Sequence, residues 1–96
     1  MSDVVAQAVT ALNEKLGGAD IGGTAKFNIE GEGSIMLDDD GARAGNDDAD
    51  VTFNADADTL KEIFEGELDP TTAFMSGRLS IDGDMGMAMK LASTLA

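Results

Sequence analysis

The spacing of apolar residues changes along this 96-residue chain, and the change limits the folds that it can adopt. Over residues 3–16, Val5, Val9, Leu12 and Leu16 recur every three or four positions, which predicts a helix with one buried face. Over residues 24–55 apolar and polar residues alternate, which predicts strands with one buried face. Helical spacing then returns, apart from a short strand around residues 79–81. The chain therefore combines helices with a sheet.

The alternating part of the chain divides into four strands, which are separated by short turns rich in Gly, Asp and Asn. These strands are expected at residues 24–30, 35–37, 42–45 and 51–55. Short turns of this composition join neighbouring antiparallel strands, so we expect the four to form an antiparallel meander.

Four helices are expected, and their ends follow from capping residues. They begin at Ser2 or Asp3, at Asp56 or Asp58, at Asp69-Pro70 and at Asp84; Gly17-Gly18 and Gly66 can end the first two. Helices on one face of a largely antiparallel sheet make an α+β fold, and 96 residues suit a single domain over residues 1–96.

Cysteine and histidine are absent from the chain. Their absence excludes disulfides, a thiolate nucleophile, zinc or haem sites with His ligands, and the usual His general base. The acidic run Asp38–Asp40 lacks the spacing of a calcium-binding loop and is expected to be a solvated turn. We therefore predict no metal, no cofactor and no enzymatic activity. The alternative is an enzyme in which a pair of carboxylates performs the catalysis.

Nineteen acidic residues against six basic ones give a formal charge of -13. This charge disfavours nucleic acid and anionic membranes as partners, because both attract clustered Lys and Arg. Apolar runs are too short to span a bilayer, so no stable membrane insertion is expected. The N-terminus lacks the pattern of a signal peptide, and a cytoplasmic location is the default expectation.

The last predicted helix carries more apolar surface than a single core contact requires. Its apolar side chains cover an arc of roughly 200°, whereas a core-facing helix needs about 100°. Helix packing, a second subunit or a ligand could cover the surplus, and the spacing leaves packing and ligand binding equally open. Three methionines within residues 85–89 modestly favour a deformable pocket lining.

The segment from Phe74 to Leu91 resembles the C-terminal signature of the sterol carrier protein 2 (SCP-2) family. That signature runs from an aromatic residue through G-K-L-x-I-x-G-[ND]-x-x-x-A-x-K-L. The matching positions are Gly77, a basic residue at Arg78, Leu79, Ile81, Gly83, Ala88, Lys90 and Leu91. The preceding Gly66, Leu68, Pro70 and Ala73 fit the family's G-x-L-x-P-x-x-A pattern.

The resemblance implies a five-stranded, mostly antiparallel sheet that is covered by helices, with an apolar cavity between the two layers. It also implies binding of sterols, fatty acids or related lipids. Two departures matter: Ser80 and Asp82 stand where relatives often carry Lys, and the chain ends soon after Leu91. We therefore expect a neutral or apolar ligand, and no peroxisomal role.

The predicted function is binding, extended to transfer, of an apolar lipid such as a sterol or fatty acid. Arg78 and Lys90 could meet a ligand headgroup, but pairing with carboxylates is favoured. The alternative function is an accessory protein that packs its C-terminal helix on a partner protein or a second copy, for instance beside enzymes of lipid or quinone biosynthesis. The candidate lipid-binding residues are Leu12, Leu16, Ile35, Phe53, Leu60, Phe64, Phe74, Met75, Met85, Met87, Met89 and Leu91.

Overall fold

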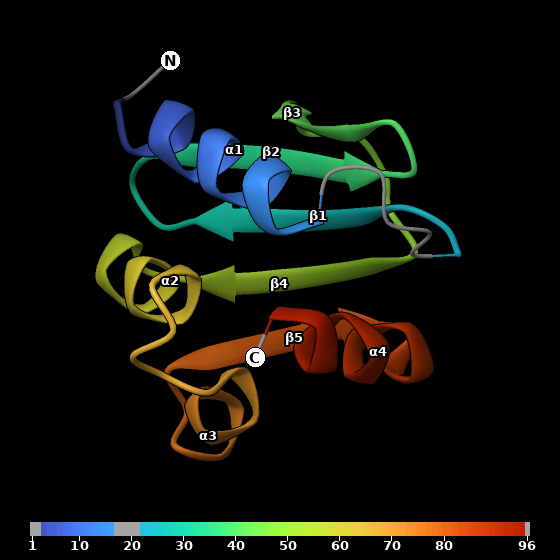
Figure 1. Cartoon of the computed structure of the whole chain (residues 1–96). Coiled ribbons are helices and arrows are strands. Elements are labelled where there is room, and N and C mark those ends of the chain that lie inside the picture. The colour runs from blue at the N-terminus through green and yellow to red at the C-terminus, as the bar shows by residue number, and fades with distance from the viewer. Residues whose placement is uncertain (1–2, 17–21, 96) are drawn as a thin grey trace.

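The computed structural model describes residues 3–16 and 22–95, with Leu95 described by its backbone alone. Helices and strands follow one another in the order shown in Figure 1. They are α1 (Asp3–Leu16), β1 (Ala25–Ile29), β2 (Gly33–Asp38), β3 (Gly41–Ala44), β4 (Val51–Ala55), α2 (Ala57–Phe64), α3 (Pro70–Met75), β5 (Leu79–Gly83) and α4 (Met85–Leu95). The predicted order of helices and strands is confirmed.

The five strands form one sheet in the order β3-β2-β1-β4-β5. Neighbouring strands are antiparallel except for β1 and β4, which run parallel. The register places Phe53 beside Phe27 on one side and beside Ile81 on the other. The prediction of a mostly antiparallel sheet is confirmed, but the prediction of a four-stranded meander is wrong, because β4 lies next to β1 and not next to β3.

The segment from Gly45 to Asp50 makes this parallel pairing by crossing the outer face of the sheet, behind β2 and β1 in Figure 1. It begins where the Gly45 amide donates to the Ser34 carbonyl (3.1 Å) and ends where the Asp50 amide donates to the Thr24 carbonyl (2.9 Å). Under it, Met36 points away from the core and is only 1% exposed. A Cβ atom on residue 45 would lie 3.0 Å from Met36 Cγ, so glycine permits the close approach.

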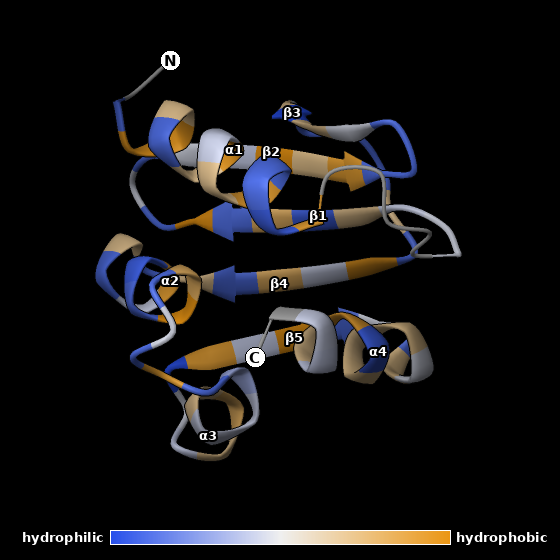
Figure 2. Cartoon of the chain, in the orientation of Figure 1, coloured by the Kyte–Doolittle hydropathy of each residue, from blue (hydrophilic) through white to orange (hydrophobic). Residues whose placement is uncertain are grey.

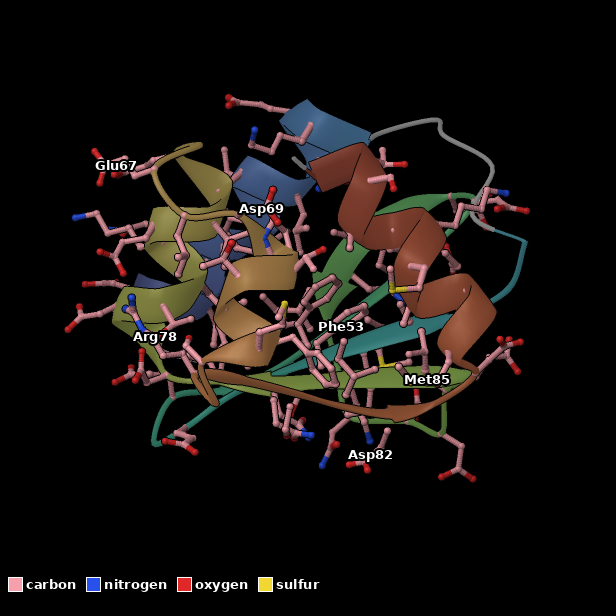
Figure 3. All side chains as sticks on the ribbon, turned by 90° about the horizontal axis from the view of Figure 1, so that it is seen from below. Phe53, Glu67, Asp69, Arg78, Asp82 and Met85 are labelled. Atoms are coloured by element: carbon pink, nitrogen blue, oxygen red, sulfur yellow. The ribbon has the colours of Figure 1, made fainter. Side chains whose placement is uncertain are left out.

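The helices all cover the other face of the sheet. Figure 3 views this arrangement from below the molecule of Figure 1, with the helices on one side of the sheet and Asp82 on the other. Between the layers the Phe27 and Phe53 rings stack at 5.0 Å, and Phe64 meets Phe27 edge-on at 6.3 Å. Figure 2 shows the alternation of apolar and polar residues along β1 that separates the two faces. The α+β class is thereby confirmed.

Aspartates cap α2, α3 and α4 as predicted, whereas Asp3 is the first residue of α1. The Asp56 carboxylate accepts a hydrogen bond from the Thr59 amide (2.7 Å), and that of Asp84 accepts one from the Met87 amide (3.1 Å). Gly66, at a φ of 79°, follows the end of α2. The caps predicted at Ser2 and at Gly17-Gly18 lie outside the described residues.

Candidate functional site

A groove runs between α1 and α2 and reaches the sheet at Ile29 of β1. We call it the α1–α2 groove, and its volume is about 460 Å³. Its apolar lining consists of Val4, Ala8, Ala11, Ile29, Ala57, Leu60 and Phe64. A volume between about 300 and 1,000 Å³ is typical of small-molecule pockets. The groove therefore has the size and the apolar lining of a ligand site.

Small side chains on the facing helices explain why this space exists. Val4, Ala8 and Ala11 recur at helical spacing on the side of α1 that faces α2, and Ala57 opens α2 opposite them. An alanine side chain ends at Cβ, so at a given distance between the two helices these positions leave more space than longer side chains would. The groove thus follows from an alanine-rich stripe beside the Leu12 side of α1.

The rim of the α1–α2 groove is polar and mostly acidic. It consists of Gln7 and Glu14 from α1 with Asp58, Lys61 and Glu65 at α2. Three carboxylates thus stand against one ammonium group. Any ligand whose hydrocarbon part fills the groove places its polar end against these side chains.

A second hollow, of about 390 Å³, adjoins this rim, and we call it the acidic hollow. It is lined by Asp58, Lys61, Glu62, Glu65, Glu67 and Arg78. Arg78 forms an ion pair with Glu62, which agrees with the expectation that this arginine pairs with a carboxylate. Asp58, Lys61 and Glu65 belong to both the rim and the hollow, so the two spaces lie next to each other at α2.

The structure places the candidate residues from the sequence in three different environments. Leu60 and Phe64 line the α1–α2 groove. Six others are buried in the same hydrophobic core as Leu60 and Phe64 but do not line the groove: Leu12, Leu16, Ile35, Phe53, Met87 and Leu91. The remaining four are exposed by 42–80%: Phe74, Met75, Met85 and Met89.

The four exposed candidates lie on α3 and α4, and we call them the α3–α4 surface. On α4, Met87 and Leu91 face the core, whereas Met85 and Met89, one helical turn apart, are 45% and 52% exposed. The excess apolar arc predicted for this helix is therefore present. Figure 3 shows Phe53 inside the molecule between α3 and α4, and Met85 at the start of α4.

The groove contains residues that the sequence analysis did not single out. Val4, Ala8, Ala11, Ile29 and Ala57 line it, and the acidic rim surrounds it. An alanine-rich stripe next to a leucine stripe on the first helix was the available signal. It became informative only with the knowledge that α2 packs beside α1.

Two aspartates outside the groove have lowered pKa values. The backbone amide of Thr59 donates a hydrogen bond to the Asp56 carboxylate and holds the pKa of that group below its usual value. Arg43 does the same for the pKa of Asp38 at the end of β2. Both shifts belong to local turns and caps, and neither marks a proton-transfer group in the groove.

Metal binding and membrane spanning find no support in the described part of the chain. Residues 3–16 and 22–95 contain no group of three or more acidic side chains arranged to hold a metal ion. Among the same residues, none of the helices is both long and apolar enough to cross a bilayer.

The model of the SCP-2 sterol transfer family matches residues 7–96. The chain belongs to this family. Two curated relatives are named hydroxysteroid dehydrogenase-like protein 2. The one from Danio rerio is 43% identical over 82 residues, which cover 77% of this chain and 20% of that protein. The one from Homo sapiens is 38% identical over 92 residues, covering 95% and 21%. This SCP-2 domain thus spans about a fifth of the length of these relatives.

Solved SCP-2 structures share the fold of the chain. The crystal structure of sterol carrier protein 2 like 2 from Aedes aegypti aligns with a TM-score of 0.78 and 22% identity, covering 94% of each chain. The solution structure of Aedes aegypti sterol carrier protein 2 in complex with palmitate gives a TM-score of 0.79 and 20% identity, covering 100% of this chain and 97% of that one. The resemblance to the SCP-2 family seen in the sequence is therefore confirmed.

Proposed function

We propose that this SCP-2 domain binds an apolar lipid, of sterol or fatty-acyl type, with its hydrocarbon part in the α1–α2 groove. The observation that carries the proposal is the groove of about 460 Å³, lined by seven apolar side chains between the helices and the sheet. A second support is that the Aedes aegypti protein of the same fold holds a 16-carbon fatty acid. Burying hydrocarbon stabilises such a complex by about 25 cal/mol per Å² removed from water.

The groove accepts a ligand more readily than the core does. The Phe27 ring already contacts the Phe53 and Phe64 rings, at centroid distances of 5.0 and 6.3 Å. A lipid reaching Phe53 would have to displace these rings, at the cost of their packing. Phe64 belongs both to this cluster and to the groove lining, so its movement would connect the groove with the buried candidates.

A matched pair of variants tests whether the groove holds the lipid. Ala11→Phe fills the groove, whereas Ala6→Phe adds the same ring at an exposed position of α1 that does not line it. We expect Ala11→Phe to weaken binding of a fluorescent acyl chain at least tenfold and Ala6→Phe to leave it within twofold. Thermal unfolding of both variants controls for loss of fold. Equal affinities in the two variants would place the lipid elsewhere.

Native mass spectrometry with lipid extraction of the purified protein tests the function itself. We expect one lipid per chain, released on denaturation. A domain that carries no lipid and takes none up from vesicles would contradict the proposal. Movement of a fluorescent acyl chain between vesicles, accelerated by the protein, tests the extension from binding to transfer.

We propose a binding role and not a catalytic one. The chain offers neither His nor Cys for acid–base or nucleophilic chemistry. The dehydrogenase-like relatives match over only about a fifth of their length, so their name does not assign a reaction to this domain.

The observation that favours the alternative function, an accessory protein, is the α3–α4 surface. Four large apolar side chains there are exposed by 42–80%, and a partner protein could cover them. A second copy is disfavoured by the charge of -13 on each chain. A molar mass measured by light scattering that exceeds the monomer mass of 9.9 kDa would support association. Monomers that carry lipid would support the binding role.

A further inference from the structure

The polar end of a lipid in the α1–α2 groove would lie in an acidic environment. The rim and the acidic hollow share Asp58, Lys61 and Glu65, and we refer to these two adjoining sets of side chains together as the opening. Its charged side chains are Glu14, Asp58, Glu62, Glu65 and Glu67 against Lys61 and Arg78, five carboxylates and two cations.

One of the two cations is already neutralised within the opening. Arg78 is paired with Glu62, both of them about 40% exposed at the side chain. Lys61 shares the opening with the four other carboxylates, which are those of Glu14 on α1, Asp58 and Glu65 at α2, and Glu67 in the hollow. The metal-ligand geometry that could otherwise explain an acidic cluster is absent from the described residues.

We propose that this opening sorts lipids by the charge of their polar end. The inference rests on the proposed function and adds a ligand class to it. Single-chain amphiphiles with a cationic head are bound more tightly than neutral ones, and neutral ones more tightly than those that end in a carboxylate or phosphate. The apolar lining sets the affinity for the chain, and the acidic rim sets the choice of head.

Elementary electrostatics fixes the direction of this preference. Unit charges about 4 Å apart interact by about 1 kcal/mol in water, and more strongly where protein excludes water. A bound carboxylate would lie among like charges, and the total charge of -13 adds repulsion at longer range. A bound ammonium group would be attracted by the rim carboxylates and also by the total negative charge of the chain. Lys61 is the one rim residue that could reverse this order by holding an anion.

Three probes with the same chain and different heads test the proposal. They are dodecyltrimethylammonium, dodecanol and laurate. Displacement of the neutral dye Nile red from the protein measures their binding, with the two ionic probes kept below their micellar concentrations and dodecanol below its solubility limit. At low salt we expect dodecyltrimethylammonium to bind about tenfold more tightly than laurate, with dodecanol between them. The difference should shrink in 0.5 M salt, where the Debye length falls to about 4 Å.

Two double variants with the same change in charge separate the rim from the total charge. Glu14→Gln with Glu65→Gln neutralises the rim, whereas Asp47→Asn with Asp48→Asn neutralises the exposed crossing segment on the other face of the sheet. The measured quantity is the affinity for dodecyltrimethylammonium divided by the affinity for laurate. We expect the rim variant to reduce this ratio at least threefold and the control to change it less than 1.5-fold. Lys61→Gln should increase the ratio.

The possible outcomes distinguish this inference from the function on which it rests. Laurate binding as tightly as the ammonium probe, with a loss in Lys61→Gln, would overturn the charge preference and leave lipid binding intact. Equal effects of the two double variants would assign the preference to the total charge, which also overturns the role of the rim. Failure of all three probes and of natural lipid extracts to bind would contradict the proposed function itself.

Discussion

Phe64 is the residue that joins the α1–α2 groove to the aromatic core. Its ring is 8% exposed, lines the groove and meets Phe27 edge-on at 6.3 Å. Because Phe27 in turn stacks on Phe53 at 5.0 Å, a change in Phe64 alters both the floor of the groove and the packing below it. Stability and ligand size are therefore coupled at this position.

Replacing Phe64 by Leu should separate these two effects. We expect Phe64→Leu to lower the free energy of unfolding by about 1–2 kcal/mol, since buried volume and an aromatic contact are lost. The deeper groove should raise the affinity for a 16-carbon chain relative to a 12-carbon chain at least twofold. Urea unfolding and dye displacement measure the two quantities. Phe74→Leu on α3, where the ring is 42% exposed, is the control and should alter stability by less than about 0.5 kcal/mol.

Met87 and Met89 occupy opposite environments although they are two residues apart. Met89 is 52% exposed, and Met87 is 8% exposed within the core cluster. We expect Met89→Lys to change the free energy of unfolding by less than about 0.5 kcal/mol and Met87→Lys to lower it by about 3 kcal/mol or more, because the second buries an unpaired charge. Chemical unfolding of both variants checks this. Equal losses would show that Met89 is also covered in solution.

At the scale of helices and strands, the sequence predicted where each element lies along the chain better than it predicted which strands are neighbours in the sheet. Alternation identified β1, β2 and β4, but short turns suggested that each strand pairs with the next. The consecutive apolar residues Ile35, Met36 and Leu37 in β2 break the alternation, and this break was the available signal. Met36 points to the outer face and is buried, so some segment has to cover it there, and the segment from Gly45 to Asp50 does.

The start of α2 gives a prediction about pH. The hydrogen bond from the Thr59 amide lowers the pKa of Asp56 in the folded protein below the usual 3.8. The ionised carboxylate therefore stabilises the fold fully above pH 3.8, and this contribution is lost as the pH falls through the lowered pKa. Asp56→Ala should lower the free energy of unfolding at pH 7 by about 1 kcal/mol.

Asp56→Asn is the matched control for this effect. Asparagine can still accept the hydrogen bond from the Thr59 amide but does not titrate. We expect it to retain most of the stability at pH 7 and to show a smaller loss than the native chain between pH 4 and pH 2. Unfolding curves measured by circular dichroism at several pH values test both. An unchanged acid profile in Asp56→Asn would show that other carboxylates dominate the acid response.

At the scale of the whole molecule, the family was predictable and the groove was not. The signature around Gly83 and Lys90 lies in one continuous stretch of sequence, so a single chain displays it. The α1–α2 groove requires Ala11 and Leu60, 49 positions apart in the chain, to face each other across two helices. Alanine, moreover, contributes little to hydrophobic patterning, because it is common on both buried and exposed helical faces. The large apolar residues Leu12 and Phe53 were predicted to bind lipid, but they lie in the core.

The excess of acidic residues also acts on the whole molecule, and it predicts how salt changes stability. Nineteen carboxylates against six cations repel one another in the compact state more than in the unfolded chain. The ion pairs Arg43–Asp38 and Arg78–Glu62 are solvent-exposed, and pairs of this kind contribute about 0–1 kcal/mol each. Repulsion therefore outweighs attraction, and shortening the Debye length from about 30 Å at 0.01 M to about 4–5 Å at 0.5 M salt should stabilise the fold.

We expect the midpoint of thermal unfolding to rise by several degrees over this range of salt concentration, at the same protein concentration, and to rise less in the variant with Asp47→Asn and Asp48→Asn. A midpoint that falls with salt would mean that the attractive pairs dominate.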